Sequence, residues 1–216
     1  MIKKKFSELS LVLTIFSQGL ERLGMTLLDT ENPVEWGKVT HLLVDEKVNT
    51  KRTAKVMVGI CRAKHVCTTA WLQTCLENDQ VQPLPSLVDP KVRTNPEPNK
   101  RITNESLERA LELRRAGKYI LSDCAVSVCK RVAGEKAPSL DELRCMVENA
   151  GGIFLGEFVP EKTIQGKHTI VITSDPCTRT QKKSLETRGE GVITKTTSWL
   201  FDTLMLQQLD LGMREE

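Results

Sequence analysis

Short apolar runs alternate along the chain with stretches in which apolar residues recur at helical spacing. In the first half, the runs predict strands at 11–14, 25–28, 41–44 and 65–67, and the helical spacing predicts helices at 18–23, 53–61 and 69–78. In the second half, the same patterns predict strands at 119–121, 153–155, 169–172 and 191–193, and helices at 140–149, 181–187 and 198–207. Alternating strands and helices predict an α/β fold, with a small parallel sheet covered on both faces.

The two halves repeat one pattern at a nearly constant distance. The segment Thr68-Thr69-Ala70-Trp71-Leu72 recurs as Thr196-Thr197-Ser198-Trp199-Leu200. The segment Arg52-Thr53-Ala54-Lys55 has a weaker counterpart, one residue out of step, in Arg179-Thr180-Gln181-Lys182. The chain therefore consists of two copies of one unit. In each copy the tryptophan falls on the apolar stripe of the last helix, which predicts a core position.

A proline-rich segment separates the two copies. Five prolines fall within residues 82–101, namely Pro83, Pro85, Pro90, Pro96 and Pro98. Proline fixes φ and has no N–H, so neither a helix nor a central strand can run through this segment. Thr103 then predicts the N-cap of a helix that runs to Arg115 and ends at Gly117. We expect a first unit at 5–82, a linker with its helix at 83–117, and a second unit at 118–212.

Composition and charge restrict the classes of function. The 216 residues are 39% hydrophobic and 27% charged, which allows packed cores in two small domains. No apolar run approaches the ~20 residues of a membrane span, and no signal peptide opens the chain, so we expect a soluble intracellular protein with no membrane partner. The net charge of +3 and the pI of about 8.4 fall short of a protein that coats DNA. An anionic partner must therefore meet a local cluster of charge.

Residue patterns typical of metal or catalytic sites are missing from the sequence. No two of the seven cysteines are separated by two residues, and the three histidines do not supply the short spacings of a zinc site. Neither a GxGxxG nor a GxxxxGK[ST] motif occurs, and no Cys–His or Ser–His pairing stands out. We expect reduced thiols packed in the core, no cofactor or metal, and no enzymatic activity.

Several segments together resemble the BRCT repeat: Thr40-His41-Leu42-Leu43-Val44, Arg52-Thr53-Ala54-Lys55 opening a helix, Gly59-Ile60-Cys61 within it, and Thr69-Ala70-Trp71-Leu72. The two-unit layout resembles the tandem BRCT modules of DNA-damage checkpoint and repair scaffolds. The proline linker, Ser106-Leu107-Glu108-Arg109-Ala110-Leu111 and Gly117-Lys118-Tyr119 are most similar to the branch that reads a phosphorylated histone tail. The resemblance implies two repeats, each a four-stranded parallel sheet flanked by helices, packed in tandem through a helical linker.

The resemblance also implies a phosphoserine peptide bound across the cleft between the repeats. A phosphate pocket needs a hydroxyl, free backbone N–H groups and a cation. Thr14 ends a predicted strand, where a turn exposes its hydroxyl and the N–H of Ile15, and Lys55 lies in the first turn of a helix. By resemblance, Thr14 and Lys55 hold the phosphate. Arg52, on the same helical face as Lys55, holds the peptide main chain or its terminal carboxylate.

Two parts of this implied site depart from the pattern or are less well defined. The family usually places glycine directly after the phosphate-binding hydroxyl residue, whereas Ile15 follows Thr14 here. Gly19 follows Ser17-Gln18, so Ser17 is the rival hydroxyl donor. The far wall of the groove comes from the second unit, near Ala137-Pro138-Ser139.

The implied partner is a phosphorylated protein, in particular the phosphorylated C-terminal tail of histone 2A at DNA damage. Binding it would recruit a repair or checkpoint scaffold to chromatin in the nucleus, and other phosphoproteins are further candidate partners. One alternative is a BRCT pair that docks an unmodified partner through the linker at 83–117. Another is a module that binds DNA ends, with direct DNA contact as a secondary function. Trp36 is either a cover residue or a partner contact.

Overall fold

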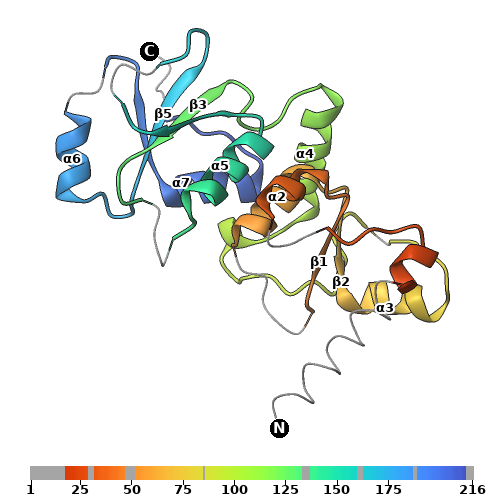
Figure 1. Cartoon of the computed structure of the whole chain (residues 1–216). Helices are drawn as coiled ribbons and strands as arrows, with labels where there is room; N and C mark the ends of the chain where they lie inside the picture. The colour runs from red at the N-terminus through yellow and green to blue at the C-terminus, as the bar shows by residue number, and fades with distance from the viewer. Residues whose placement is uncertain are drawn as a thin grey trace, which may run out of the picture.

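A computed structural model describes residues 18–28, 32–46, 52–84, 86–132, 137–159, 163–186 and 189–212. The first and second units each contain a parallel sheet, and helix α2 (Ala54–Arg62) of the first unit lies beside α5 (Leu140–Asn149) of the second (Figure 1). None of the helices in the described ranges has the length and apolar content of a membrane-spanning segment.

The sheet of the second unit has four parallel strands in the order β4-β3-β5-β6. Its strands are β3 (Cys124–Val128), β4 (Ile153–Glu157), β5 (His168–Thr173) and β6 (Ile193–Thr196). The two central strands, β3 and β5, are almost entirely buried, because helices cover a parallel sheet on both faces. Helices α5 (Leu140–Asn149), α6 (Arg179–Leu185) and α7 (Thr197–Leu206) connect or follow these strands.

The strand predicted at 119–121 is wrong. Residues 120–123 form a turn, in which the Ser122 hydroxyl accepts a hydrogen bond from the Tyr119 N–H at 2.7 Å. Leu121 is fully buried, so this short apolar run serves the core rather than a strand. The true strand, β3, begins at Cys124 and was missed because small and polar residues interrupt its apolar pattern.

In the first unit, β1 (His41–Val44) and β2 (His65–Thr68) form a two-stranded parallel sheet within the described ranges. The strand predicted at 11–14 lies outside those ranges. The strand predicted at 25–28 is wrong, because these residues have no regular structure. Residues 18–22 are helical, and the chain turns at Gly24, whose φ is +67°. The N–H of Met25 closes that turn by donating to the Leu20 carbonyl. This N–H is therefore not available for pairing with another strand.

The linker extends the sheet of the first unit on the outer side of β2. Val66 and Val88 form a parallel bridge, in which the Val66 N–H donates to the Leu87 carbonyl and the Asp89 N–H donates to the Val66 carbonyl, both at 2.9 Å. This pairing is confined to one bridge at the edge of the sheet, as expected of a proline-rich segment.

Hydroxyl N-caps start the helices close to the predicted positions. These helices include α2 (Ala54–Arg62), α3 (Thr69–Glu77) and α4 (Asn104–Arg115), besides α5, α6 and α7. Their N-caps are Thr53, Thr68, Thr103, Ser139, Thr178 and Thr196. Each side-chain oxygen accepts a backbone N–H from the first turn, which otherwise has no partner.

The internal repeat extends to a tertiary hydrogen bond. The indole N–H of Trp71 donates to the carbonyl of Gln82, and that of Trp199 donates to the carbonyl of Asp210, in each case eleven residues further on. Both rings are half-buried and pack on the rim of a core, rather than inside it as predicted. Each tryptophan therefore holds the segment that follows the last helix of its unit.

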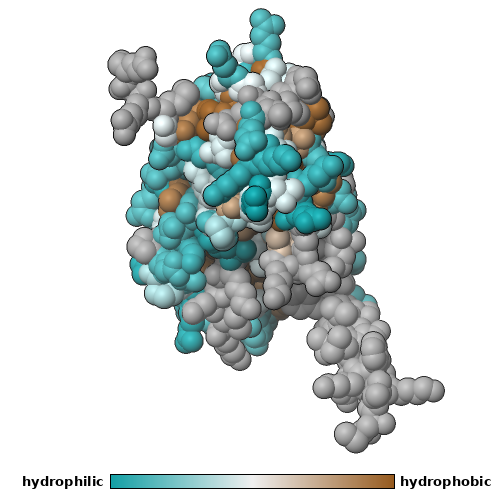
Figure 2. Space-filling view, turned by 90° about the vertical axis from the view of Figure 1, so that its left-hand side faces the viewer, coloured by the Kyte–Doolittle hydropathy of each residue, from teal (hydrophilic) through white to brown (hydrophobic). Residues whose placement is uncertain are grey.

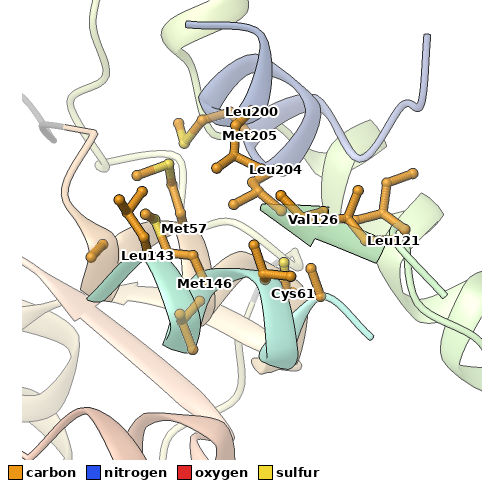
Figure 3. Packing of buried hydrophobic residues seen from close by; sticks show 14 of the residues in the cluster. Met57, Cys61, Leu121, Val126, Leu143, Met146, Leu200, Leu204 and Met205 are labelled. Atoms are coloured by element: carbon orange, nitrogen blue, oxygen red, sulfur yellow. The ribbon is translucent and has the colours of Figure 1, made fainter. Parts of the chain in front are cut away.

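One apolar core runs through both units. Met57 and Cys61 of α2 pack with Leu143 and Met146 of α5 and with Leu204 of α7 (Figure 3). A smaller cluster, formed by Leu20, Leu72 and Cys75, lies under α3. Since α2 shares its core with α5 and α7, the start of α2 has a defined position relative to the second unit.

Helix α4 of the linker joins the ends of two other helices. Arg109 donates to the Leu206 carbonyl at the end of α7, at 2.8 Å from Nε and 2.5 Å from Nη2. Arg114 donates to the carbonyls of Cys61 and Ala63 at the end of α2, at 2.5 and 3.0 Å. Carbonyls at a helix C-terminus lack intrahelical partners and favour a nearby cation. Arg114 therefore holds the first unit to the linker helix, and Arg109 holds the second unit to it.

Candidate functional site

The described residues include only part of the predicted site. Thr14, Ile15 and Ser17 lie outside them, so the choice of hydroxyl donor stays a prediction. Lys55, Arg52 and residues 137–139 are described, and the site is built from these.

Lys55 is the second residue of α2 and lies in its first turn, two positions after the N-cap Thr53. The Thr53 hydroxyl accepts the N–H of Val56 at 3.3 Å, and the first turn of α2 contains no acidic residue. The positive end of the helix dipole and the ammonium of Lys55 therefore act in the same place. This arrangement suits a phosphate, which carries about −1.5 to −2 charges.

Trp36 lies next to Lys55, which the sequence did not indicate. It belongs to η1 (Pro33–Lys38), a 3₁₀ helix that packs on α2 and α5. The Nζ of Lys55 is 5.7 Å from the centroid of the Trp36 ring, within the range of a cation–π interaction. The Trp36 side chain is buried in the core shared by the two units. The structure therefore favours a residue that covers this core over a residue that contacts a partner.

Arg52 has a different position from the predicted one. It precedes the N-cap of α2, so it does not share a helical face with Lys55. Its Nη1 forms an ion pair with the carboxylate of Asp202 on α7, and its guanidinium carbon is 5.6 Å from the centroid of the Phe201 ring. The guanidinium therefore lies at the junction of the two units, where one of its donors is already paired.

Residues 137–139 precede helix α5, and Ser139 is its N-cap. The Ser139 hydroxyl accepts the N–H of Glu142 at 3.1 Å, and the Ser139 N–H donates to the Glu142 carboxylate at 2.8 Å. This capping box, together with Asp141, places acidic side chains at the start of α5. The groove expected between this segment and Lys55 stays a prediction.

The second unit lacks the counterpart of Lys55. The two helices can be aligned by their N-caps, Thr53 and Thr178. Thr180 then takes the position of Lys55, and Cys177 takes that of Arg52. The sequence match of residues 52–55 with residues 179–182 is therefore out of register with the structure. Gln181 is buried there. Its side-chain oxygen accepts the N–H groups of Ser174 and Thr178, and its amide donates to Lys130 and Ser174. In the second unit a fully paired, buried glutamine therefore lies one residue after the position that corresponds to Lys55.

The outer face of the second unit, which carries α6, is mostly hydrophilic with scattered apolar side chains (Figure 2). The exposed residues of α6 include Arg179, Lys182 and Lys183. Helix α6 has seven residues, and its exposed polar surface is typical of a helix that covers a sheet.

The sequence matches no protein-family model and no curated protein. Among solved structures, the chain is similar to the crystal structure of the BRCT5-BRCT6 domains of Brc1 from S. pombe. The TM-score is 0.64 at 20% sequence identity, over 91% of this chain and 89% of that chain. The likeness covers most of both chains, which confirms the fold implied by the motifs. The chain has the fold of a tandem BRCT module.

Proposed function

We propose that the chain is a phosphopeptide-binding module whose phosphate site lies at the start of α2. The position of Lys55 carries this proposal. Its ammonium adds to the dipole of a nine-residue helix whose first turn has no acidic side chain. The hydroxyl of Thr14, or of Ser17 as its rival, is the third component. A charge-assisted hydrogen bond from each group contributes roughly 1.5–3 kcal/mol.

The peptide would continue from this phosphate toward the second unit. Arg52 lies between the start of α2 and helix α7, so it is the next cation along that path. A guanidinium has five N–H donors, and the ion pair with Asp202 leaves donors for a peptide carbonyl or a terminal carboxylate. This geometry supports a phosphoserine that lies a few residues before the end of a chain.

The ligand that fits this proposal is the phosphorylated C-terminal tail of histone 2A at DNA damage. Binding it would recruit a repair or checkpoint scaffold to chromatin in the nucleus, without catalysis. The resemblance of the linker and its helix to the histone-reading branch supports this choice, and the fold shared with the Brc1 domains is compatible with it.

Isothermal titration calorimetry tests the proposal with a phosphorylated peptide from that histone tail, its unphosphorylated twin and a scrambled phosphopeptide. We expect micromolar affinity for the first and no measurable affinity for the second. Lys55→Met should weaken binding roughly 10- to 100-fold. The control Lys64→Met removes an exposed charge just beyond the other end of α2 and should bind like the parent chain.

Three outcomes would count against the proposal. Equal affinities for the phosphorylated and unphosphorylated peptides would refute the proposed phosphopeptide binding. A partner that survives Lys55→Met but is lost on changes within 83–117 would indicate docking through the linker. Binding to naked DNA with a steep dependence on salt would indicate a DNA-end module.

A further inference from the structure

We propose that Trp36 is a positioning residue for Lys55, so that the tryptophan ring holds the ammonium at the start of α2. The inference rests on the proposed function and deepens it, because it assigns a second residue to the phosphate site. It rests on one contact, the 5.7 Å separation between the Nζ of Lys55 and the ring centroid of Trp36.

The ring of Trp36 is held by packing. Only 7% of the residue is exposed, and it belongs to the core shared by α2, α5 and α7. Its indole N–H has no hydrogen-bond partner among the described residues, so no hydrogen bond there orients the ring. Helix η1 packs on both α2 and α5, which places the ring at the boundary between the units.

A fixed aromatic face restricts a flexible cation without neutralising it. A lysine side chain has four rotatable bonds and loses considerable entropy when it is immobilised. The negative face of the indole attracts the ammonium by its quadrupole and leaves the full positive charge in place. An aspartate or glutamate at the same place would also restrict Lys55, but it would repel the phosphate. The ring therefore preorganises Lys55 for an anion.

A double-mutant cycle tests this role. Affinity for the phosphorylated histone-tail peptide is measured by calorimetry for Trp36→Leu and Trp36→Phe, each with Lys55 and with Lys55→Met. We expect Trp36→Leu to weaken binding about three- to ten-fold in the parent chain, and Trp36→Phe to retain most of the affinity because it keeps an aromatic face. With Lys55→Met, the Trp36→Leu change should cost nothing further.

The second unit offers a matched control. The Nζ of Lys195 is 5.5 Å from the ring centroid of Trp199, a similar lysine–tryptophan pair in the second unit that does not include Lys55. Trp199→Leu should leave the peptide affinity unchanged while altering thermal stability. Thermal unfolding of every variant shows which ones remain folded at the temperature of the titration.

A spectroscopic measurement avoids the risk that Trp36→Leu fails to fold. The chain is labelled with 5-fluorotryptophan, and Trp36→Phe identifies the ¹⁹F resonance of Trp36. Saturating phosphopeptide should shift this resonance in the parent chain and not in Lys55→Met, while the Trp199 resonance stays in place.

The outcomes separate the two proposals. If the parent chain does not distinguish the phosphorylated peptide from its twin, the proposed function fails and this inference fails with it. If the parent distinguishes them, but Trp36→Leu has the same effect with and without Lys55, only the positioning role is overturned. The positioning role would also be overturned if the ¹⁹F resonance of Trp36 did not shift at saturating phosphopeptide.

Discussion

Arg52, just before α2 in the first unit, forms an ion pair with Asp202 on α7 in the second unit. The two side chains are 17% and 30% exposed. Asn99, in η2 (Pro98–Lys100) of the linker, donates from its Nδ2 to the same carboxylate at 3.0 Å. One carboxylate thus joins both units and the linker, next to the predicted path of the peptide. Arg52 therefore has a structural role besides the binding role that the resemblance implies.

A charge swap separates these two roles of Arg52. Arg52→Asp and Asp202→Arg should each lower the free energy of unfolding by about 1–2 kcal/mol, because each leaves a half-buried charge facing a like charge. The double variant should recover most of this loss in urea unfolding. It should not recover affinity for a phosphopeptide with a free terminal carboxylate, since that affinity needs the guanidinium on the side of α2. Full recovery of both properties would contradict a contact between Arg52 and the peptide.

The terminal carboxylate of the peptide gives a second measure of Arg52. We expect Arg52→Ala to weaken binding of a phosphopeptide that ends in a free carboxylate, because the guanidinium pairs well with that group. Amidation of the same peptide should erase the difference between Arg52→Ala and the parent in calorimetry. A difference that persists after amidation would place Arg52 on the peptide main chain instead.

The hydroxyl donor is tested by two alanine substitutions. Thr14→Ala should weaken phosphopeptide binding roughly ten-fold or more, because it removes a charge-assisted hydrogen bond, whereas Ser17→Ala should have a small effect. Fluorescence anisotropy with a labelled peptide measures both variants. The reverse ranking would identify Ser17 as the donor.

Two histidines of the first unit predict a dependence of stability on pH. His41 and His65 pair across β1 and β2 with ring centroids 5.2 Å apart, and the His41 ring stacks on Trp71. Burial lowers the pKa of both histidines below 6.5. Nearby Lys64 contributes to each lowering, and His65 also lowers the pKa of His41.

The folded state therefore disfavours protonated histidine, and the unfolded chain binds these protons first as pH falls. Stability should be fully present above pH ~6.5 and decline as pH falls through the lowered pKa values of the folded state. Urea unfolding between pH 7.5 and 5 measures this decline. The double variant His41→Phe/His65→Phe should flatten it. An unchanged slope would assign the dependence to other groups.

The two arginines of α4 predict how the linker stabilises the fold. Arg114→Met leaves the carbonyls of Cys61 and Ala63 without their charged donor, and Arg109→Met does the same to Leu206. Each change should cost about 1–2 kcal/mol in urea unfolding, since both sites are partly exposed. Arg115→Met, at an exposed neighbouring position, should be nearly neutral. If all three variants were equally stable, the arginines would not link the units.

Local signals in the sequence determined the order of the elements, the repeat and the helix starts. The helical spacing of apolar residues located the helices, and Thr103 with Gly117 bounded the linker helix, because caps act within a single turn. The Thr-Thr-x-Trp-Leu motif identified the repeat correctly. Short apolar runs were less reliable. Residues 25–28 follow a helix-ending turn, and Leu121 fills the core from a turn.

Only the tertiary structure decided which side chains meet at the start of α2. Arg52 and Asp202 are 150 residues apart, and Trp36 reaches Lys55 from a 3₁₀ helix that no periodicity indicated. Such contacts follow from the packing of α2 on α5 and α7, where the shape of the whole core sets which surfaces touch. The sequence thus placed a cation at the start of a helix, because capping is local. Its neighbours depend on long-range packing, which no pattern along the chain encodes.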